Sequence, residues 1–265
     1  MMEPLNTLTP GQTARLQKTI EALLLLHQAG ALGGEAMPED ANPRLPKASE
    51  ANSLYFTLPM ALNYQRNSYK LWEAAAATYG DAETADVFRP GAVARMHPDM
   101  LRQKLCRHKL ALQPNRHPLI WLRLCQTFAE SYGGSVRSFF AAHTYSVAEI
   151  KAHMIANKKR FPYLSGEKIM NYWLYVMGQY TDAVFTDTEN ITVAPDTHVL
   201  QASVKLGLIQ PEDTARAGVR ETVSGLWRQA LAGTGRRPID IHTALWLWSR
   251  GGFAVDPNQA YVTTK

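Results

Sequence analysis

The sequence predicts an all-α fold, and three observations support this prediction. Apolar residues recur at helical spacing along most of the chain, and helix caps and glycine stops bound these runs. No long segment alternates apolar and polar residues as a half-buried strand does, although residues 182–194 could hold a short extended piece. The chain has 265 residues, of which 46% are hydrophobic and 19% charged, so it is globular and long enough to bury a core without disulfides.

The first helix is predicted to begin at Pro10. Thr9 is a suitable N-cap, and proline is favoured at the first helical position. Apolar residues from Leu16 onward follow at helical spacing until Gly30 ends the run. Residues 33–52 contain three prolines and few apolar side chains, so they predict a surface loop or linker.

Three helical segments are predicted in the middle of the chain. Residues 53–79 carry apolar side chains at helical spacing and predict a helical pair that stops at Gly80. Residues 97–110 predict a basic helix, and residues 119–132 predict a more apolar helix that a pair of glycines closes.

A helical hairpin is predicted over residues 146–179. Ser146 and Glu149 have the spacing of a capping box, which begins a helix that ends near Asn157. A short basic turn follows, and the second helix carries Lys168 in its first turn.

Three helices are predicted in the C-terminal part of the chain. Asp196 is placed to cap the first of them. A long helix is predicted from Pro211 to Gly233, and the last from Asp240 to Gly251.

Composition and motif spacing exclude several function classes. The net charge of +5 is a mild excess that is compatible with a polyanionic partner. Cys106 and Cys125 are too few for a disulfide scaffold and predict two reduced core thiols. The histidines lack the spacing of metal ligands, so we expect no metal and no other cofactor. No apolar run approaches the ~18 residues of a membrane span and no secretory signal is evident, so we expect a cytoplasmic protein without a membrane partner.

The turn of the hairpin is a candidate phosphate-binding element. Turns before a helix N-terminus can direct backbone N–H groups outward, here at Ser165 and Gly166. Lys158, Lys159 and Arg160 precede the turn and would add cationic contacts that are independent of DNA sequence.

Two motifs, in this order, resemble the helix-hairpin-helix DNA glycosylase superfamily. Phe161-Pro-Tyr-Leu-Ser-Gly-Glu-Lys168-Ile-Met is similar to the Leu-Pro-Gly-Val-Gly-x-Lys-x-Ala hairpin of that superfamily, with one glycine where two are usual. Ala194-Pro-Asp196-Thr-His-Val199 is similar to its Val-Asp-Thr-His-Val segment. Lys168 matches the lysine of the bifunctional members, and Asp196 matches the aspartate found at the active site across the superfamily.

Within the superfamily, the chain most resembles the archaeal 8-oxoguanine DNA glycosylase group. Leu62-Asn-Tyr-Gln-Arg-Asn-Ser-Tyr-Lys-Leu-Trp72 is similar to the early helix pair of that group, and Tyr172 matches an aromatic residue there. Residues 225–247 resemble its C-terminal helix pair. His242 stands where the group carries an aspartate that contacts the damaged base.

The resemblance implies a two-lobed helix-hairpin-helix glycosylase-like fold within a single domain, residues 1–265. The first lobe would comprise residues 1–62 and 182–265, and the second residues 63–181 with the hairpin. The implied function is DNA base-excision repair. An oxidised purine, with 8-oxoguanine as the first candidate, would be released and the strand cut at the abasic site. The implied partner is damaged double-stranded DNA, bound by a monomer associated with the nucleoid.

The residue types suit this chemistry. The implied catalytic pair is Lys168, whose neutral amine would form a Schiff base, and Asp196, which would accept a proton or stabilise a positive sugar. A position in the first helical turn and burial both disfavour the charged ammonium of Lys168. A flipped base needs flat walls and a polar reader. The implied base-binding residues are Tyr172, Trp246 and Trp72 for stacking and His242 for hydrogen bonding.

Other interpretations remain open. His242 in place of an acid favours an N-glycosidase for a different damaged or modified base or nucleoside. A DNA-binding helix-hairpin-helix module without catalysis is the alternative from another class. Taken singly, Lys168 has the pattern of a surface residue, Asp196 that of an N-cap, and the aromatic residues that of a core. His198 is predicted to be structural, because it lies about 200° around the helix from Asp196.

Overall fold

The computed structural model of the chain describes residues 7–33 and 37–258, and all regular secondary structure in these ranges is helical. The all-α prediction is therefore confirmed for the described residues. The segment 182–194 forms no strand and contains one short 3₁₀ helix, η4 (Thr188–Asn190).

The chain divides into two compact units. The end unit comprises Met1–Glu35 and Glu189–Lys265, and the middle unit comprises Ala36–Thr188. Residues 36–62 belong to the middle unit, whereas the sequence interpretation placed them in the lobe formed by the two ends of the chain. The physical reason is burial, because Tyr55 and Phe56 pack against Trp72 inside the middle unit.

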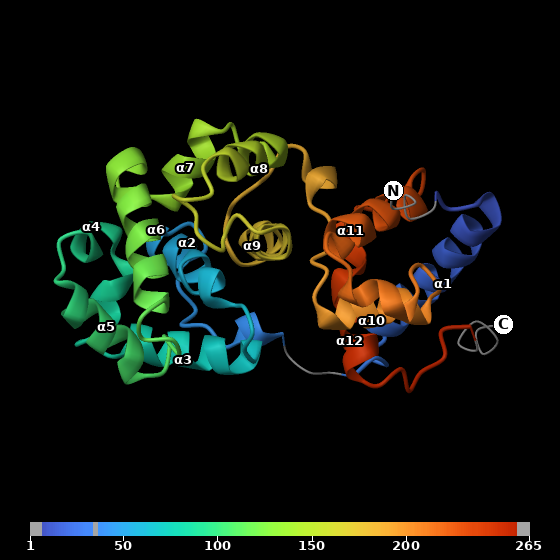
Figure 1. Cartoon of the computed structure of the whole chain (residues 1–265), viewed down its shortest axis with the longest axis horizontal. Helices are drawn as coiled ribbons and strands as arrows, with labels where there is room; N and C mark the ends of the chain where they lie inside the picture. Colours follow the sequence, from blue (N-terminus) through green and yellow to red (C-terminus); the bar gives the residue numbers. More distant parts are fainter. Residues whose placement is uncertain (1–6, 34–36, 259–265) are drawn as a thin grey trace. The chain divides into compact units, whose positions relative to one another are not determined.

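Four α-helices make up the described part of the end unit: α1 (Pro10–Gln28), α10 (Thr197–Lys205), α11 (Val219–Leu231) and α12 (His242–Arg250). The first helix, α1, packs against α11 and α12, and α10 packs against α12 (Figure 1). Two 3₁₀ helices, η5 (Pro211–Ala215) and η6 (Pro238–Ile241), precede α11 and α12. Thr9 caps α1 with the expected proline at the first helical position.

The middle unit contains the remaining α-helices of the described residues: α2 (Glu50–Thr57), α3 (Ser68–Gly80), α4 (Pro90–Val93), α5 (Pro98–Arg107), α6 (His117–Tyr132), α7 (Val136–Ala142), α8 (Val147–Ala156) and α9 (Glu167–Tyr180). Its 3₁₀ helices are η1 (Pro38–Asp40), η2 (Pro59–Leu62) and η3 (Ala85–Phe88). Aromatic side chains are a large part of the core, where edge-to-face and tilted ring pairs are favourable. The fully buried ones are Tyr55, Phe56, Trp72, Trp121, Phe128, Phe139, Phe140, Phe161 and Trp173.

Two predicted helices are interrupted in the structure. The segment from Pro211 to Gly233 forms η5 and α11 as separate elements, because Gly218 adopts a left-handed φ of 78° between them. Asp240 lies in η6 and does not begin α12. Its carboxylate accepts a hydrogen bond from the backbone N–H of Arg237 at 3.0 Å.

The predicted surface loop at residues 33–52 includes residues 34–36, which lie outside the described residues, and its described part from residue 37 onward contains helical structure. It contains η1, and Glu39 within η1 is 0% exposed. A proline-rich pattern predicts irregular backbone, and it carries no information about which side chain a neighbouring helix will bury.

Within residues 7–33 and 37–258, no helix has the length and hydropathy of a membrane span. In the same ranges, no three His, Cys, Asp or Glu side chains gather into a possible metal site. Both cysteines are free thiols: Cys125 is buried as expected, but Cys106 is partly exposed.

Candidate functional site

The hairpin begins at a doubly capped helix. The Ser146 hydroxyl accepts from the Glu149 N–H at 3.2 Å, as the capping motif predicts. The Glu149 carboxylate accepts from the hydroxyl of Thr144. The Asp187 carboxylate supplies further acceptors at this end of α8, for the backbone N–H groups of Val147 and Ala148. The start of α8 is thus fixed by two side chains.

The turn between α8 and α9 is held by its own backbone and by a ring stack. Tyr163 adopts a left-handed φ of 61°, and its ring stacks on Tyr64 with centroids 4.1 Å apart. The Gly166 N–H donates to the Tyr163 carbonyl at 3.1 Å. A Cβ atom at position 166 would lie 3.2 Å from that carbonyl oxygen, so the close turn favours glycine.

This turn does not direct the predicted amides outward. The N–H of Ser165 donates to the Phe161 carbonyl at 3.0 Å, and that of Gly166 donates within the turn. Ser165 is also only 8% exposed. The candidate amides for an anion are then those of the first turn of α9, because a helix does not supply intrahelical acceptors for its first N–H groups. Gly166, the N-cap of α9, provides no side-chain acceptor for them.

The three predicted cationic residues before the turn differ in their surroundings. Lys158 and Lys159 are exposed. Arg160 is half-buried, donates to the Ser131 hydroxyl and accepts from Thr127 through its carbonyl. Arg160 therefore attaches the turn to α6, and the two lysines are the exposed cations.

Lys168 is the second residue of α9 and is half-buried. A polar network beside it ties α8 to α9. Lys151 donates to the Asn171 side-chain carbonyl at 2.9 Å, and Asn171 donates to the Glu167 carboxylate at 2.9 Å. Asn171 is fully buried, so this network fixes the helical turn that carries Lys168.

Tyr172 follows Lys168 by one helical turn, and its hydroxyl donates to Glu39 Oε2 at 2.9 Å. The indole N–H of Trp72 donates to Glu39 Oε1 at 2.8 Å. Burial raises the pKa of Glu39 to about 7. No pattern in the sequence pointed to Glu39, because only the tertiary packing encloses its carboxylate.

Trp72 is a core residue in this structure. Its side chain is 0% exposed and packs against Tyr55 and Phe56 at centroid distances of 5.7 and 5.5 Å. Because no face of the ring is exposed, its position does not support the stacking role that the sequence interpretation assigned to it. Its contribution to the site is the hydrogen bond to Glu39.

In the end unit, the structure brings Asp196 and Trp246 together. Asp196 is the N-cap of α10, as predicted, and its Oδ1 accepts from the Val199 N–H at 2.9 Å. Its Oδ2 accepts from the indole N–H of Trp246 at 3.1 Å. One oxygen of the carboxylate therefore fixes the helix end, and the other is oriented by an aromatic residue 50 positions later in the chain.

Three further residues lie near this pair or on the same helix, α12. The His198 ring lies 5.4 Å from the Trp246 ring, and its Nδ1 is 3.3 Å from the Ser249 hydroxyl, a contact in keeping with a structural histidine. The Arg250 guanidinium lies 5.2 Å from the centre of the Trp246 ring. His242, one turn before Trp246, is only 3% exposed.

The candidate residues thus form two clusters, one in each unit. The lysine cluster of the middle unit contains Lys168, Tyr172, Glu39 and Trp72. The aspartate cluster of the end unit contains Asp196, Trp246, His198 and Arg250.

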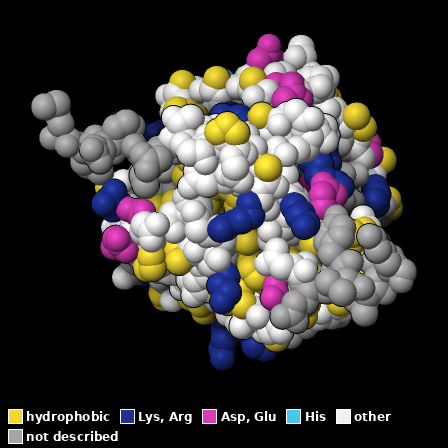
Figure 2. All heavy atoms as spheres, turned by 90° about the vertical axis from the view of Figure 1, so that its right-hand side faces the viewer, with side chains coloured by type: hydrophobic (Ala, Val, Ile, Leu, Met, Phe, Trp, Pro, Cys, Tyr) yellow, Lys and Arg dark blue, Asp and Glu magenta, His cyan; other side chains and the backbone are white. Residues whose placement is uncertain are grey.

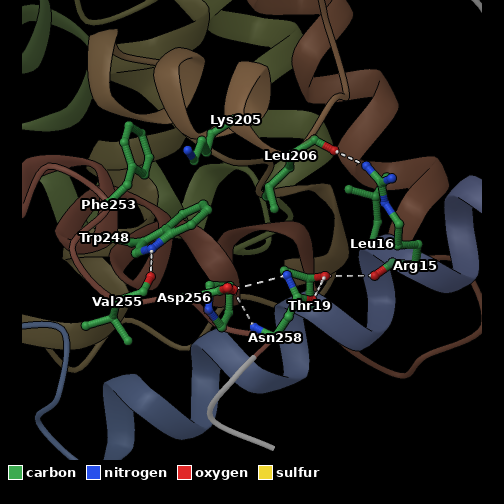
Figure 3. A pocket seen from close by; sticks show the side chains of 11 residues that line it. Arg15, Leu16, Thr19, Lys205, Leu206, Trp248, Phe253, Val255, Asp256 and Asn258 are labelled. Atoms are coloured by element: carbon green, nitrogen blue, oxygen red, sulfur yellow. Dashed lines mark hydrogen bonds between the residues drawn. The ribbon is translucent and has the colours of Figure 1, made fainter.

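A pocket of about 610 Å³ in the end unit is separate from the aspartate cluster. Side chains of α1, α10 and α12 line it together with Leu206, Phe253 and residues 255–258. Figure 3 shows Arg15, Lys205 and Trp248 around this pocket, with the Trp248 indole donating to the Val255 carbonyl at 2.7 Å. Neither Asp196 nor Trp246 lines it.

The excess positive charge lies in the middle unit. Residues 37–188 carry 18 Lys and Arg against 13 Asp and Glu, whereas residues 7–33 and 189–258 together carry 9 against 8. Figure 2 shows one face of the molecule, on which Lys and Arg side chains lie among apolar and acidic ones.

Comparison with known proteins gives no family assignment: the chain matches no protein-family model and no curated protein sequence.

Proposed function

We propose that the protein is a DNA base-excision repair glycosylase with abasic-site lyase activity. Its substrate class is duplex DNA carrying an oxidised purine, with 8-oxoguanine as the first base to test. The hydrogen bond between Trp246 and Asp196 carries the proposal. These residues belong to two separate segments that resemble the same superfamily, and the fold joins them in one contact.

Lys168 is the proposed nucleophile. Its neutral amine attacks C1′ of the damaged nucleotide, and the base departs with the electrons of the N-glycosidic bond. Opening of the sugar ring gives a Schiff base between C1′ and Nζ. Loss of a C2′ proton then breaks the C3′–O bond by β-elimination and releases the 3′ phosphate. The first turn of α9 disfavours the ammonium form of Lys168, because the helix dipole is positive there.

Asp196 is the proposed carboxylate partner. Its two hydrogen bonds use both carboxyl oxygens as acceptors and fix their orientation, since a backbone N–H and an indole N–H can only donate. An oriented carboxylate suits stabilisation of the positive charge that develops on the sugar.

Reductive trapping tests the proposal directly. The protein is incubated with borohydride and a duplex that carries 8-oxoguanine opposite cytosine, and in parallel with an abasic-site duplex. A covalent adduct is expected with both. Lys168→Gln should abolish both adducts while duplex affinity stays within about twofold, because one lysine contributes little to phosphate binding. Lys70→Gln is the matched control, since Lys70 is an exposed lysine paired with Glu73 on α3.

The other outcomes separate the alternatives. An adduct with the abasic duplex alone would support the lyase activity and show that the excised base is a lesion other than 8-oxoguanine. The buried His242 on α12 is in line with that outcome. Equal trapping by Lys168→Gln would remove Lys168 as the nucleophile. Salt-sensitive binding with no adduct from either duplex would favour a binding module.

A further inference from the structure

Glu39 lies at the centre of a buried hydrogen-bonded cluster that joins η1, α3 and α9 of the middle unit. Each of its carboxylate oxygens has one side-chain partner: Oε1 accepts from the Trp72 indole of α3 at 2.8 Å, and Oε2 accepts from the Tyr172 hydroxyl of α9 at 2.9 Å. Glu39 and Trp72 are both 0% exposed. The carboxylate therefore links the core to a residue one helical turn from the proposed nucleophile.

The titratable groups that face Glu39 are one carboxyl group and three tyrosine hydroxyls. Asp40 lies beside it in η1, Tyr55 faces it from α2, and Tyr172 and Tyr180 face it from α9. Tyr180 donates to the Asp40 carboxylate at 2.8 Å. Burial is the largest effect on the pKa of Glu39 and raises it to about 7, so both protonation states are populated near neutrality.

The two protonation states make different hydrogen bonds to Tyr172. The indole N–H can only donate, so Oε1 remains an acceptor for Trp72 in both states. A proton on Oε2 makes that oxygen a donor, and the Tyr172 hydroxyl then accepts. Hydrogen bonds to an ionised group are roughly twice as strong as neutral ones, so the ionised state holds the phenol more firmly.

We propose that Glu39 is a positioning residue for Tyr172, and that its ionised carboxylate fixes the phenol ring in the orientation that stacks on the damaged base. The inference rests on the proposed function, because it needs a lesion for Tyr172 to bind. Recognition of the damaged base is then stronger in neutral to mildly alkaline solution than in mildly acidic solution, since ionisation of Glu39 strengthens the Tyr172 hydrogen bond.

The test measures the preference for damaged DNA, given as the ratio of the dissociation constants of undamaged and 8-oxoguanine duplexes. The full chain with Lys168→Gln is used so that no strand is cut. At constant ionic strength, the preference should rise about fivefold between about pH 6 and about pH 8.5, with a midpoint near 7. Glu39→Gln imitates the protonated state, because the amide donates to Tyr172 and its carbonyl accepts from Trp72. Its preference should be low and independent of pH.

Tyr172→Phe is a second variant that tests whether the hydrogen bond between Glu39 and Tyr172 causes the pH dependence. It removes the hydroxyl and keeps the ring, so the pH dependence should disappear, and adding Glu39→Gln should cause no further change. Glu73→Gln is the matched control, because Glu73 is an exposed acid next to Trp72 on α3, and it should keep the full pH profile.

An unchanged pH profile in Glu39→Gln or in Tyr172→Phe would overturn the inference. A failure of the proposed function can be distinguished from a failure of this inference. If the chain with Lys168 intact forms no adduct while Lys168→Gln still prefers damaged DNA with the expected profile, the lyase chemistry is wrong and the role of Glu39 stands. The absence of any preference at every pH would overturn both lesion recognition and the inference.

Discussion

At the residue scale, the hydrogen bond from Trp246 to Asp196 distinguishes an oriented carboxylate from an ordinary helix cap. A cap needs only one oxygen, and Asp196 uses Oδ1 for the Val199 N–H. The second oxygen receives the indole N–H, so the carboxylate has one rotational position. The ring that provides this donor also has the Arg250 guanidinium beside it.

Trp246→Phe tests that orientation. The substitution keeps an aromatic ring next to Arg250 and removes the N–H that reaches Asp196. We expect the rate of base excision to fall about tenfold, as one hydrogen bond to a charged group is worth roughly 1.5–3 kcal/mol. Single-turnover release of 8-oxoguanine measures this. Trp248→Phe is the control, because Trp248 also loses an indole hydrogen bond, to the Val255 carbonyl. An equal loss in both variants would contradict the assignment.

Local sequence patterns were enough to predict the helix N-caps, whereas the roles of Glu39 and Trp72 depend on tertiary burial. Asp196 and Ser146 were predictable because an N-cap depends on residues within one helical turn. Glu39 and Trp72 were not, because their burial depends on α3 and α9 meeting η1. An aromatic residue at helical spacing is compatible with a core or a binding site, and only its exposed fraction separates the two.

At the element scale, the tight backbone turn between α8 and α9 depends on Gly166. A methyl group there would lie 3.2 Å from the Tyr163 carbonyl oxygen, so the turn must open slightly to hold it. Opening shifts the first turn of α9, where Lys168 and the candidate phosphate-binding amides lie. The pattern of the sequence predicted this hairpin, but the inward hydrogen bonds of Ser165 and Gly166 depend on the left-handed Tyr163, which no residue preference indicated.

Gly166→Ala should therefore weaken binding to damaged and undamaged duplexes alike, by about three- to tenfold, because phosphate contacts are independent of base identity. Fluorescence anisotropy with both duplexes measures this. Gly178→Ala on the same helix, α9, is the control: nothing lies within 4 Å of its added methyl group, so we expect unchanged affinity and slightly higher stability. A loss confined to the damaged duplex would place Gly166 in base recognition.

At the scale of the whole molecule, two sets of buried groups give stability opposite dependences on pH. Burial lowers the pKa of His117 to about 4 and lowers the pKa values of His143 and His153. The unfolded chain takes up these protons first, so stability is complete above about pH 6.5 and is lost as the pH falls. Glu39 has a raised pKa, so its contribution is present below about pH 4.5 and is lost as the pH rises through 7.

Because three histidines act against the single Glu39 carboxyl over this range, the urea midpoint should fall between about pH 6.5 and about pH 4.5. His143→Phe should reduce that fall, because the His143 and His153 rings lie 4.5 Å apart and would repel each other when charged. Tryptophan fluorescence follows the transition. His97→Asn is the control, since His97 is exposed and an asparagine keeps an acceptor for the α5 cap. A midpoint that does not change over this range would contradict the prediction.

Hydrophobic periodicity predicted the helical class, and it does not determine which helices share a core. Residues 33–52 have the pattern of a surface loop and residues 53–62 carry apolar side chains at helical spacing, and neither pattern is specific to one unit. The membership of residues 36–62 in the middle unit follows from the fit of Tyr55 and Phe56 around Trp72. Such complementarity of shape is a property of three-dimensional packing.

The end unit is built from two separate segments of the chain, and this arrangement has a consequence for the order of folding. Its two segments are separated in the chain by the whole of the middle unit, which is one continuous segment. During synthesis α1 leaves the ribosome before the middle unit, and its packing partners α11 and α12 leave after it. The apolar residues of α1, Leu16, Ile20 and Leu23, must stay in solution or on a chaperone until then. A nascent chain that stops just after Thr188 would therefore contain every residue of the middle unit, Lys168 included, before Asp196 has been made.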